Sequence, residues 1–214
     1  MKPILLHFFL LIVVLELIGE ATETLWLVYS CKPIIMLLLI GWLAAKQDLK
    51  PNFILFLGTI FALLGDVFLM IRGANLFIFG LGSFLLMQVC YIIHFSKSYS
   101  FQWKSTIPFI IYGLGFLAIL YKPIIQNIST QNLFIPIIFY SMTLCSMGVM
   151  AAMRKKVVSE TSYVWVLAGA ILFILSDSTI ALNRFVQPFV GASFLIMSTY
   201  AAAQWLIVRG LFKN

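Results

Sequence analysis

Apolar residues run in long blocks along this chain, and only short polar stretches separate them. Each block has the length of about 17 to 25 residues that a helix needs to cross a hydrocarbon layer of about 30 Å. The pattern therefore predicts an all-α, polytopic membrane helix bundle forming a single integral membrane domain over residues 1–214. We expect eight transmembrane helices, near residues 4–19, 25–45, 52–71, 76–95, 106–122, 132–153, 162–182 and 187–208.

The composition supports a membrane protein, and the charges in the loops predict how the chain is oriented across the membrane. Only 10% of residues are charged, against about 25% in soluble domains. Lys and Arg in short loops stay on the cytoplasmic side, and we predict that both termini face the cytoplasm. The pI of 9.4 then reflects membrane topology, and no nucleic acid partner is implied. The cytoplasmic set comprises Lys2, Lys46, Lys50, Lys97, Lys104, Arg154, Lys155, Lys156, Arg209 and Lys213, and the opposite set Arg72, Lys122 and Arg184.

The first apolar block has an alternative interpretation as a signal peptide, because "GEAT" offers small residues for cleavage. Glu16 inside the block argues against it. The three cysteines lie within predicted helices, which does not suit a disulfide framework, and two histidines in unrelated contexts predict no metal site. The short loops and the lack of a soluble domain are in the style of a bacterial inner membrane protein.

The two halves of the chain resemble each other weakly. Tyr29 aligns with Tyr140, and Asp66 with Asp177, both at an offset of 111 residues, and "SFLLM" at 83–87 meets "SFLIM" at 193–197. One four-helix unit used twice, over 1–110 and 111–214, explains these matches, and an even number of helices makes the repeat parallel. Chance similarity between apolar helices is the alternative.

Glu16, Lys32, Asp66 and Asp177 are ionisable groups inside predicted helices. The predicted orientation places all four in the outer half of the membrane. A charge at a helix centre costs about 2.5 to 3.5 kcal/mol on insertion scales, so these groups should face the bundle interior and one another. The structural alternative is a brace in which Lys32 pairs with one aspartate and the other is protonated.

Further polar residues are predicted near the depth of the two aspartates. Arg72 and Arg184 follow the two aspartates by six and seven residues, which places them about two turns further out, where they suit a phosphate group. Interfacial snorkelling is an equal alternative for both arginines. The other candidates for substrate contact are Asn183, beside Arg184, and Tyr91, Tyr140 and Tyr200, whose simpler role is packing with a satisfied hydroxyl.

Two aspartates in a dry cavity cannot easily both ionise, so one is expected to hold a proton and the other to be a carboxylate. Such a pair suits a reaction through an oxocarbenium ion, in which the acid gives a proton and the anion stabilises positive charge or activates water. It also suits peptide hydrolysis by an aspartyl dyad, or proton coupling in a carrier.

Several segments carry a family resemblance. "LLGDVFLM", "FIFGLGSFLLMQVCYIIHF", "GAILFILSDSTIALNRF" and "PFVGASFLIMSTYAAAQWLI", with an early "CKP", resemble the YhhN family of integral membrane proteins, the lysoplasmalogenases. The likeness extends from about Cys31 to Ile207. It implies an eight-helix fold and hydrolysis of the vinyl ether of lysoplasmalogens, which gives a fatty aldehyde and glycerophosphocholine or glycerophosphoethanolamine, without a cofactor.

The structure of the implied lysophospholipid matches the predicted depths of the polar residues in the membrane. Its tail would lie deep in the bundle, its vinyl ether at Asp66 and Asp177, and its phosphate at Arg72, Arg184 and Lys32. We favour Asp66 as the proton donor because its neighbours are apolar, whereas Ser176 and Ser178 could solvate an ionised Asp177.

Two other functions remain open. The Gly-x-Gly-Asp motif of intramembrane aspartyl proteases is broken in this chain, because Leu63 replaces the first glycine. A small-molecule or proton-coupled transporter is the stronger rival, since repeats with buried charges are common in carriers. A purely structural role conflicts with so many costly buried charges.

Overall fold

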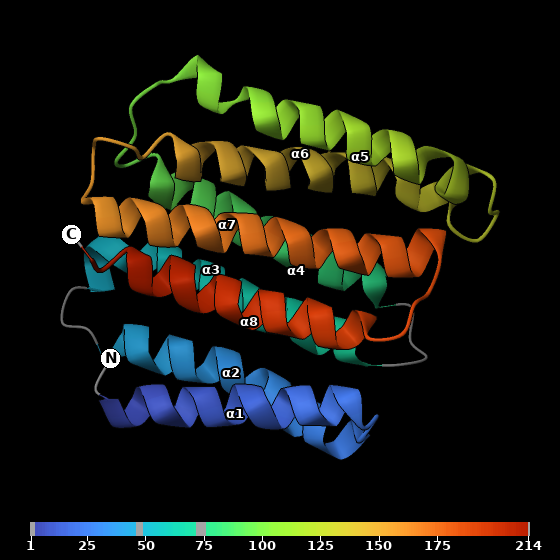
Figure 1. Ribbon diagram of the computed structural model, residues 1–214, viewed down its shortest axis with the longest axis horizontal. Coiled ribbons are helices and arrows are strands. Elements are labelled where there is room, and N and C mark those ends of the chain that lie inside the picture. The colour runs from blue at the N-terminus through green and yellow to red at the C-terminus, as the bar shows by residue number, and fades with distance from the viewer. Residues whose placement is uncertain (1–2, 46–48, 72–75, 214) are drawn as a thin grey trace. The chain divides into compact units, whose positions relative to one another are not determined.

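The computed structural model describes residues 3–45, 49–71 and 76–213, and its regular structure there is entirely helical. The chain forms two compact units, Met1–His94 and Phe95–Asn214. Four long helices fall in each unit (Figure 1). The predicted all-α bundle of eight helices is therefore confirmed.

The first unit consists of α1 (Pro3–Ala21), α2 (Leu25–Ala44), α3 (Leu49–Met70) and α4 (Phe77–Phe95), whose last residue opens the second unit. Its core lies along one face of α2, where Ile35, Met36 and Leu39 are fully buried. The α3–α4 pair packs closely because Gly58 has no side chain, and a Cβ there would stand 2.8 Å from the ring of Tyr91.

The second unit consists of α5 (Ile107–Ile125), α6 (Phe134–Ala152), α7 (Glu160–Ala181) and α8 (Ala192–Gly210). Short 3₁₀ turns, η1 (Trp103–Ser105) and η2 (Gln131–Leu133), precede α5 and α6, and a π-helical turn, η3 (Leu182–Val186), continues α7. Helix α8 begins at Ala192, later than the predicted residue 187, because Leu182–Val186 and the segment after it complete the turn from α7.

Seven of the described helices are long and apolar enough to cross a membrane. On α5 the exposed apolar residues Ile107, Ile110, Ile111 and Leu114 follow a helical period. A soluble helix turns such a stripe toward its core, whereas lipid favours it on the outside. The outward stripe thus agrees with an integral membrane protein.

Helix α8 is less apolar than the seven helices just described, and its packing explains why. Half of it is buried, including Ala201, Ala203 and Gln204, so its polar and small residues face protein. Gly169 on α7 lies so close that a Cβ there would stand 2.9 Å from the carbonyl oxygen of Ala203. Small residues allow this backbone approach, as is usual between membrane helices.

Candidate functional site

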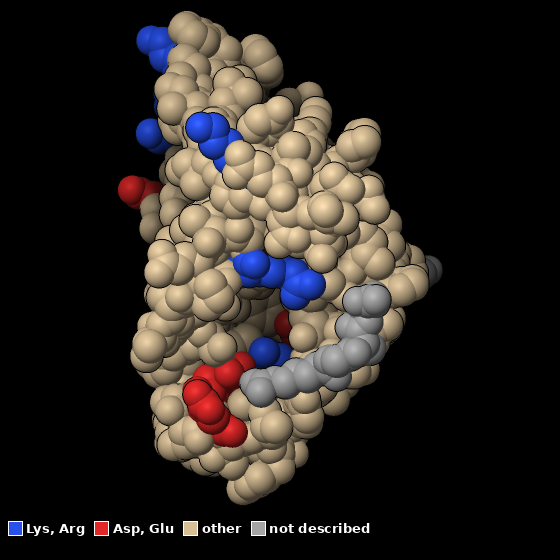
Figure 2. Space-filling model, turned by 90° about the vertical axis from the view of Figure 1, so that its right-hand side faces the viewer, with Lys and Arg blue, Asp and Glu red and all other residues tan. Residues whose placement is uncertain are grey.

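Acidic side chains gather in the first unit at the end where α1 meets α2 (Figure 2, red). Glu16 and Glu20 are one turn apart on α1, so they share a face of that helix. A tight turn then reverses the chain. Thr22 donates its hydroxyl to the carbonyl of Ile18 at 2.8 Å, and Glu23 takes a left-handed φ of 54°.

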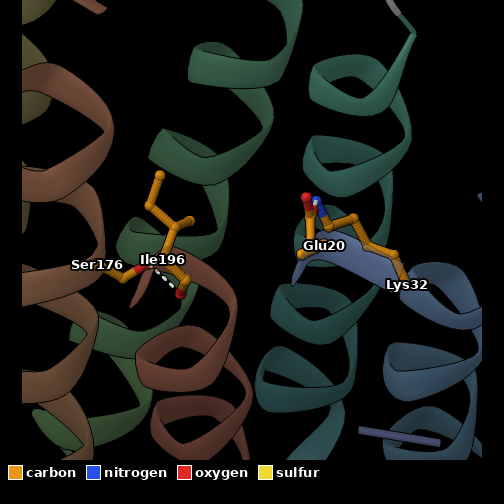
Figure 3. Close-up of polar contacts among 4 residues, drawn as sticks. All are labelled: Glu20, Lys32, Ser176 and Ile196. Atoms are coloured by element: carbon orange, nitrogen blue, oxygen red, sulfur yellow. Dashed lines mark hydrogen bonds and ion pairs between the residues drawn. The ribbon is translucent and has the colours of Figure 1, made fainter. Parts of the chain in front are cut away.

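The turn brings Lys32 of α2 back to α1. Its Nζ lies 3.4 Å from Oε1 of Glu20 in an ion pair of two largely buried side chains (Figure 3). The structural alternative considered above paired Lys32 with an aspartate, and Glu20 lay one residue beyond the predicted helix 4–19. Helix α1 instead extends to Ala21, so Glu20 faces Lys32 from inside the helix.

Glu16 and Asp66 join the same cluster. Glu16 is fully buried and interacts electrostatically with Lys32, Glu20 and Asp66. Neither oxygen of its carboxylate receives a hydrogen bond from a described residue. Asp66, on α3, is 5% exposed. Three carboxyl groups and one ammonium group thus come together at this end of the first unit.

Asp177 is the acid of the second unit, and it has a different environment. It is buried on α7 and accepts a hydrogen bond of 2.5 Å from the hydroxyl of Tyr140 on α6. Asp66 and Asp177 each lie four residues before the end of the third helix of their unit, at Met70 and Ala181. The first unit surrounds its aspartate with charges, and the second with a neutral hydroxyl.

The serines beside Asp177 do not act as the sequence suggested. Ser176 donates to the carbonyl of Ile196 on α8 at 3.0 Å, and Ser178 donates to the carbonyl of Ile174 at 2.5 Å. The hydroxyl of Tyr112 on α5 also contacts that of Ser178. Each serine has one proton and has already given it to a carbonyl, so neither supplies a donor to Asp177. The prediction that they solvate Asp177 is wrong, and Tyr140 takes that place.

The π-helical turn holds Asn183 and Arg184. The side chain of Asn183 accepts a hydrogen bond of 3.1 Å from the backbone of Phe189 and so fixes the segment leading to α8. Arg184 is exposed, and its guanidinium lies 5.9 Å from the ring centre of Phe185. Arg72, its predicted counterpart, lies outside the described residues.

The two remaining candidates lie in packed interfaces. Tyr91 is fully buried in the first unit, against Gly58. Gly58 is eight residues before Asp66, about 12 Å along α3. Tyr200 is 4% exposed on α8, and its ring centre is 6.0 Å from that of Phe173. Packing accounts for both positions.

Comparison with known sequences gives these sites a context. The sequence model of the YhhN family matches residues 27–211. The chain belongs to the YhhN family. The match includes both aspartates, Lys32 and Tyr140, while Glu16 and Glu20 precede it.

Relatives of this YhhN chain are named lysoplasmalogenases. Lysoplasmalogenase TMEM86A of Homo sapiens is 29% identical over 197 residues, 86% of this chain and 77% of that protein. Its counterpart in Bos taurus is 30% identical over 164 residues, 75% and 65%. Lysoplasmalogenase of Mycobacterium tuberculosis (strain CDC 1551 / Oshkosh) is 28% identical over 142 residues, 64% and 51%. The chain thus spans about half to three quarters of these relatives. No solved structure matches it significantly.

The contacts that were not predicted include the Glu20–Lys32 ion pair and the Tyr112–Ser178 contact. The first had a signal in the sequence, because Glu16 and Glu20 have the one-turn spacing of residues on one helical face. The second had none. Tyr112 and Ser178 are far apart in the chain, and the packing of α5 on the end of α7 that joins them left no pattern in either segment.

Proposed function

We propose that this chain is a lysoplasmalogenase, which hydrolyses the vinyl ether of lysoplasmalogens to a fatty aldehyde and glycerophosphocholine or glycerophosphoethanolamine. The observation that carries the proposal is a pair of buried aspartates at equivalent helix positions, Asp66 beside other acids and Asp177 beside a tyrosine hydroxyl. Family membership and the names of the relatives support the same chemistry.

The substrate class fits the polarity of the chain. A lysoplasmalogen has one alkyl tail, which suits a bundle of apolar helices. Its enol ether lies between this tail and the glycerol, so it requires acid chemistry below the membrane surface. Its phosphate needs cations nearer the surface, and we assign that role to Arg72 and Arg184, with Lys32 deeper in its ion pair.

The reaction follows from the reactivity of an enol ether. One carboxyl group protonates the β-carbon of the vinyl ether, and the positive charge appears on the α-carbon and the ether oxygen. A water molecule adds to the α-carbon and gives a proton to the second carboxylate. The hemiacetal then breaks its bond to the glycerol oxygen, which takes the proton held by the second carboxyl group. The hemiacetal hydroxyl gives its own proton to the first carboxylate, so the aldehyde is released and both groups return to their starting states. One water is consumed.

The two aspartates differ in a way that suits these roles. Asp66 has apolar neighbours in the sequence and lies near the buried Glu16, so we assign it the protonation of carbon. Asp177 accepts a hydrogen bond from the hydroxyl of Tyr140, which can solvate a carboxylate, and we assign it the oxocarbenium ion and the attacking water. The proposal requires both to act on the same vinyl ether, and the similar depth that the sequence predicts for them in the membrane supports it.

An aldehyde-release assay on the purified protein tests the proposal. Wild type, Asp66→Asn and Asp177→Asn would be incubated with lysoplasmalogen, and aldehyde measured by mass spectrometry. General acid–base groups contribute about 10² to 10⁴-fold, so we expect each variant to lose activity by at least about a hundredfold. Glu160→Gln, which removes an exposed acid at the start of α7, is the matched control and should keep wild-type turnover.

Wild-type turnover in either asparagine variant would remove that residue from the mechanism. Absence of aldehyde from folded wild-type protein would overturn the hydrolase assignment. Movement of intact lipid across proteoliposomes without aldehyde would assign the transporter instead.

A further inference from the structure

The guanidinium of Arg154 is buried in the second unit, where α6 ends and the chain turns into α7. The residue is 2% exposed. Its Nη2 donates to the hydroxyl of Ser162 at 3.1 Å, and the guanidinium lies 5.7 Å from the ring centre of Phe95. Its Nε and Nη1 have no hydrogen-bond partner among the described residues.

Snorkelling does not explain this position. A snorkelling arginine covers apolar surface with its methylenes and keeps its charged head in water. Lys155 and Lys156, the next two residues, are exposed in that way, but Arg154 is not. Burial lowers the pKa of Arg154 to about 10, so the side chain remains charged at neutral pH. A buried cation with unused donors lacks part of its compensation.

The surroundings of Arg154 carry more positive charge. Ser162 is in the first turn of α7, whose N-cap is Ser159. A helix N-terminus has a partial positive charge and unsatisfied N–H groups, which favour an anion and disfavour a cation. Arg154 nevertheless donates its hydrogen bond into this turn.

Other cations lie near the first turn of α7: Lys213 in the C-terminal segment, and Lys155 and Lys156 in the loop between α6 and α7. Ser159 donates to the backbone carbonyl of Lys213 at 2.6 Å, and Nζ of Lys213 lies 5.2 Å from the ring centre of Trp165. Glu160 is the one acid of this turn among the described residues, and it is exposed and forms no ion pair with Arg154.

We propose that the α6–α7 turn of the second unit is a binding site for a phosphate-class anion, held by Arg154 and the first turn of α7. A phosphate group has several strong acceptor oxygens and the negative charge that Arg and a helix N-terminus both favour. Lys155, Lys156 and Lys213 raise the local concentration of such anions. The phosphate belongs either to a lipid headgroup of the adjacent leaflet or to a soluble phosphate, and it is separate from the substrate of the aspartates.

Thermal unfolding of the full chain in nanodiscs tests the site. Wild type would be measured in neutral phosphatidylcholine, in phosphatidylcholine with inorganic phosphate against chloride at equal ionic strength, and in discs containing phosphatidylglycerol. We expect phosphate or phosphatidylglycerol to raise the Tm. Arg154→Gln should weaken apparent binding about tenfold, the effect of losing one strong charged hydrogen bond. Lys155→Gln removes the same charge from an exposed neighbour and should retain most of the effect.

Stabilisation by inorganic phosphate in neutral discs would identify a soluble ligand, and stabilisation by phosphatidylglycerol alone a lipid. Equal stabilisation of wild type and Arg154→Gln would overturn the proposal. If Arg154→Gln does not fold, hydrogen exchange on wild type decides. Amides of residues 153–163 should exchange more slowly with the stabilising anion, and unchanged exchange with both anions would equally overturn the site.

Discussion

Asp66 and Asp177 occupy equivalent positions in their units and yet have different partners. Asp177 has a single neutral donor, the hydroxyl of Tyr140. Asp66 shares a cluster with Glu16, in which Lys32 already pairs with Glu20. The aligned residue of Tyr140 is Tyr29, which is exposed on α2. The alignment of the two halves predicts the two acids in register, but the residues around the acids differ between the units.

Tyr140→Phe tests the role of the donor to Asp177. A hydrogen bond to a charged group contributes about 1.5 to 3 kcal/mol. If the bond helps Asp177 to stabilise the oxocarbenium ion, its loss should lower kcat about tenfold to a hundredfold with little change in KM. Aldehyde release at several substrate concentrations measures both constants.

Tyr121→Phe is the control for that substitution. Tyr121 is exposed, and its ring contact with Phe134 survives the loss of the hydroxyl. The control should behave as wild type. A kcat for Tyr140→Phe equal to that of the control would show that the hydroxyl serves packing alone.

Helix α7 carries Asp177 and the two serines beside it, and its packing on α8 fixes where these side chains point. Gly169 lets the two backbones approach, and Ser176 bonds across the same interface to the carbonyl of Ile196. The π-helical turn Leu182–Val186 then ends the helix after Asp177. Such turns are frequent at functional sites. The α7–α8 pair thus acts as a rigid support for Asp177.

Gly169→Ala tests this support. Its Cβ would stand 2.9 Å from the carbonyl oxygen of Ala203 and 3.0 Å from the backbone N of Ile207, and backbone atoms cannot move aside cheaply. Overpacking typically costs about 1 to 3 kcal/mol, so the free energy of unfolding in detergent should fall by that amount.

The matched control is Gly115→Ala, in the interior of α5, where a Cβ would meet nothing within 4 Å. Alanine is favoured over glycine in a helix by about 1 kcal/mol, so this variant should unfold at an equal or higher denaturant concentration. A Gly169→Ala protein as stable as the control would mean that the α7–α8 interface can open without cost.

The helices could be predicted from the sequence because each is an apolar run of membrane length, a local property. The start of α8 could not, since Leu182–Val186 adopts a π-helical turn that apolarity does not reveal. The depth of Glu16, Lys32 and Asp66 followed from counting residues, and the structure brings these three together. The partners of Glu20 and Asp177 could be identified only from the packing of α1 on α2 and of α6 on α7.

The charge distribution of the whole molecule predicts how it lies in the membrane. Ten of the thirteen Lys and Arg residues assigned to helix ends and loops fall on the side of the termini, and three on the other. The run 154–156 lies between α6 and α7, and the loop 126–130 lies between α5 and η2. Since Lys and Arg in short loops are retained in the cytoplasm, we predict cytoplasmic termini and an external 126–130 loop.

Reporter fusions in a bacterial host measure this orientation. A green fluorescent protein joined after Asn214 folds only in the cytoplasm and should fluoresce, whereas alkaline phosphatase joined after Ser129 is active only outside and should be active. Phosphatase joined after Lys156 is the control and should be inactive. The reverse pattern would place the basic loops outside, which would contradict the charge rule. It would also put the Arg154 turn in the external leaflet and the predicted level of the aspartates near the cytoplasm. The proposed lysophospholipid substrate would then have to enter from the inner leaflet.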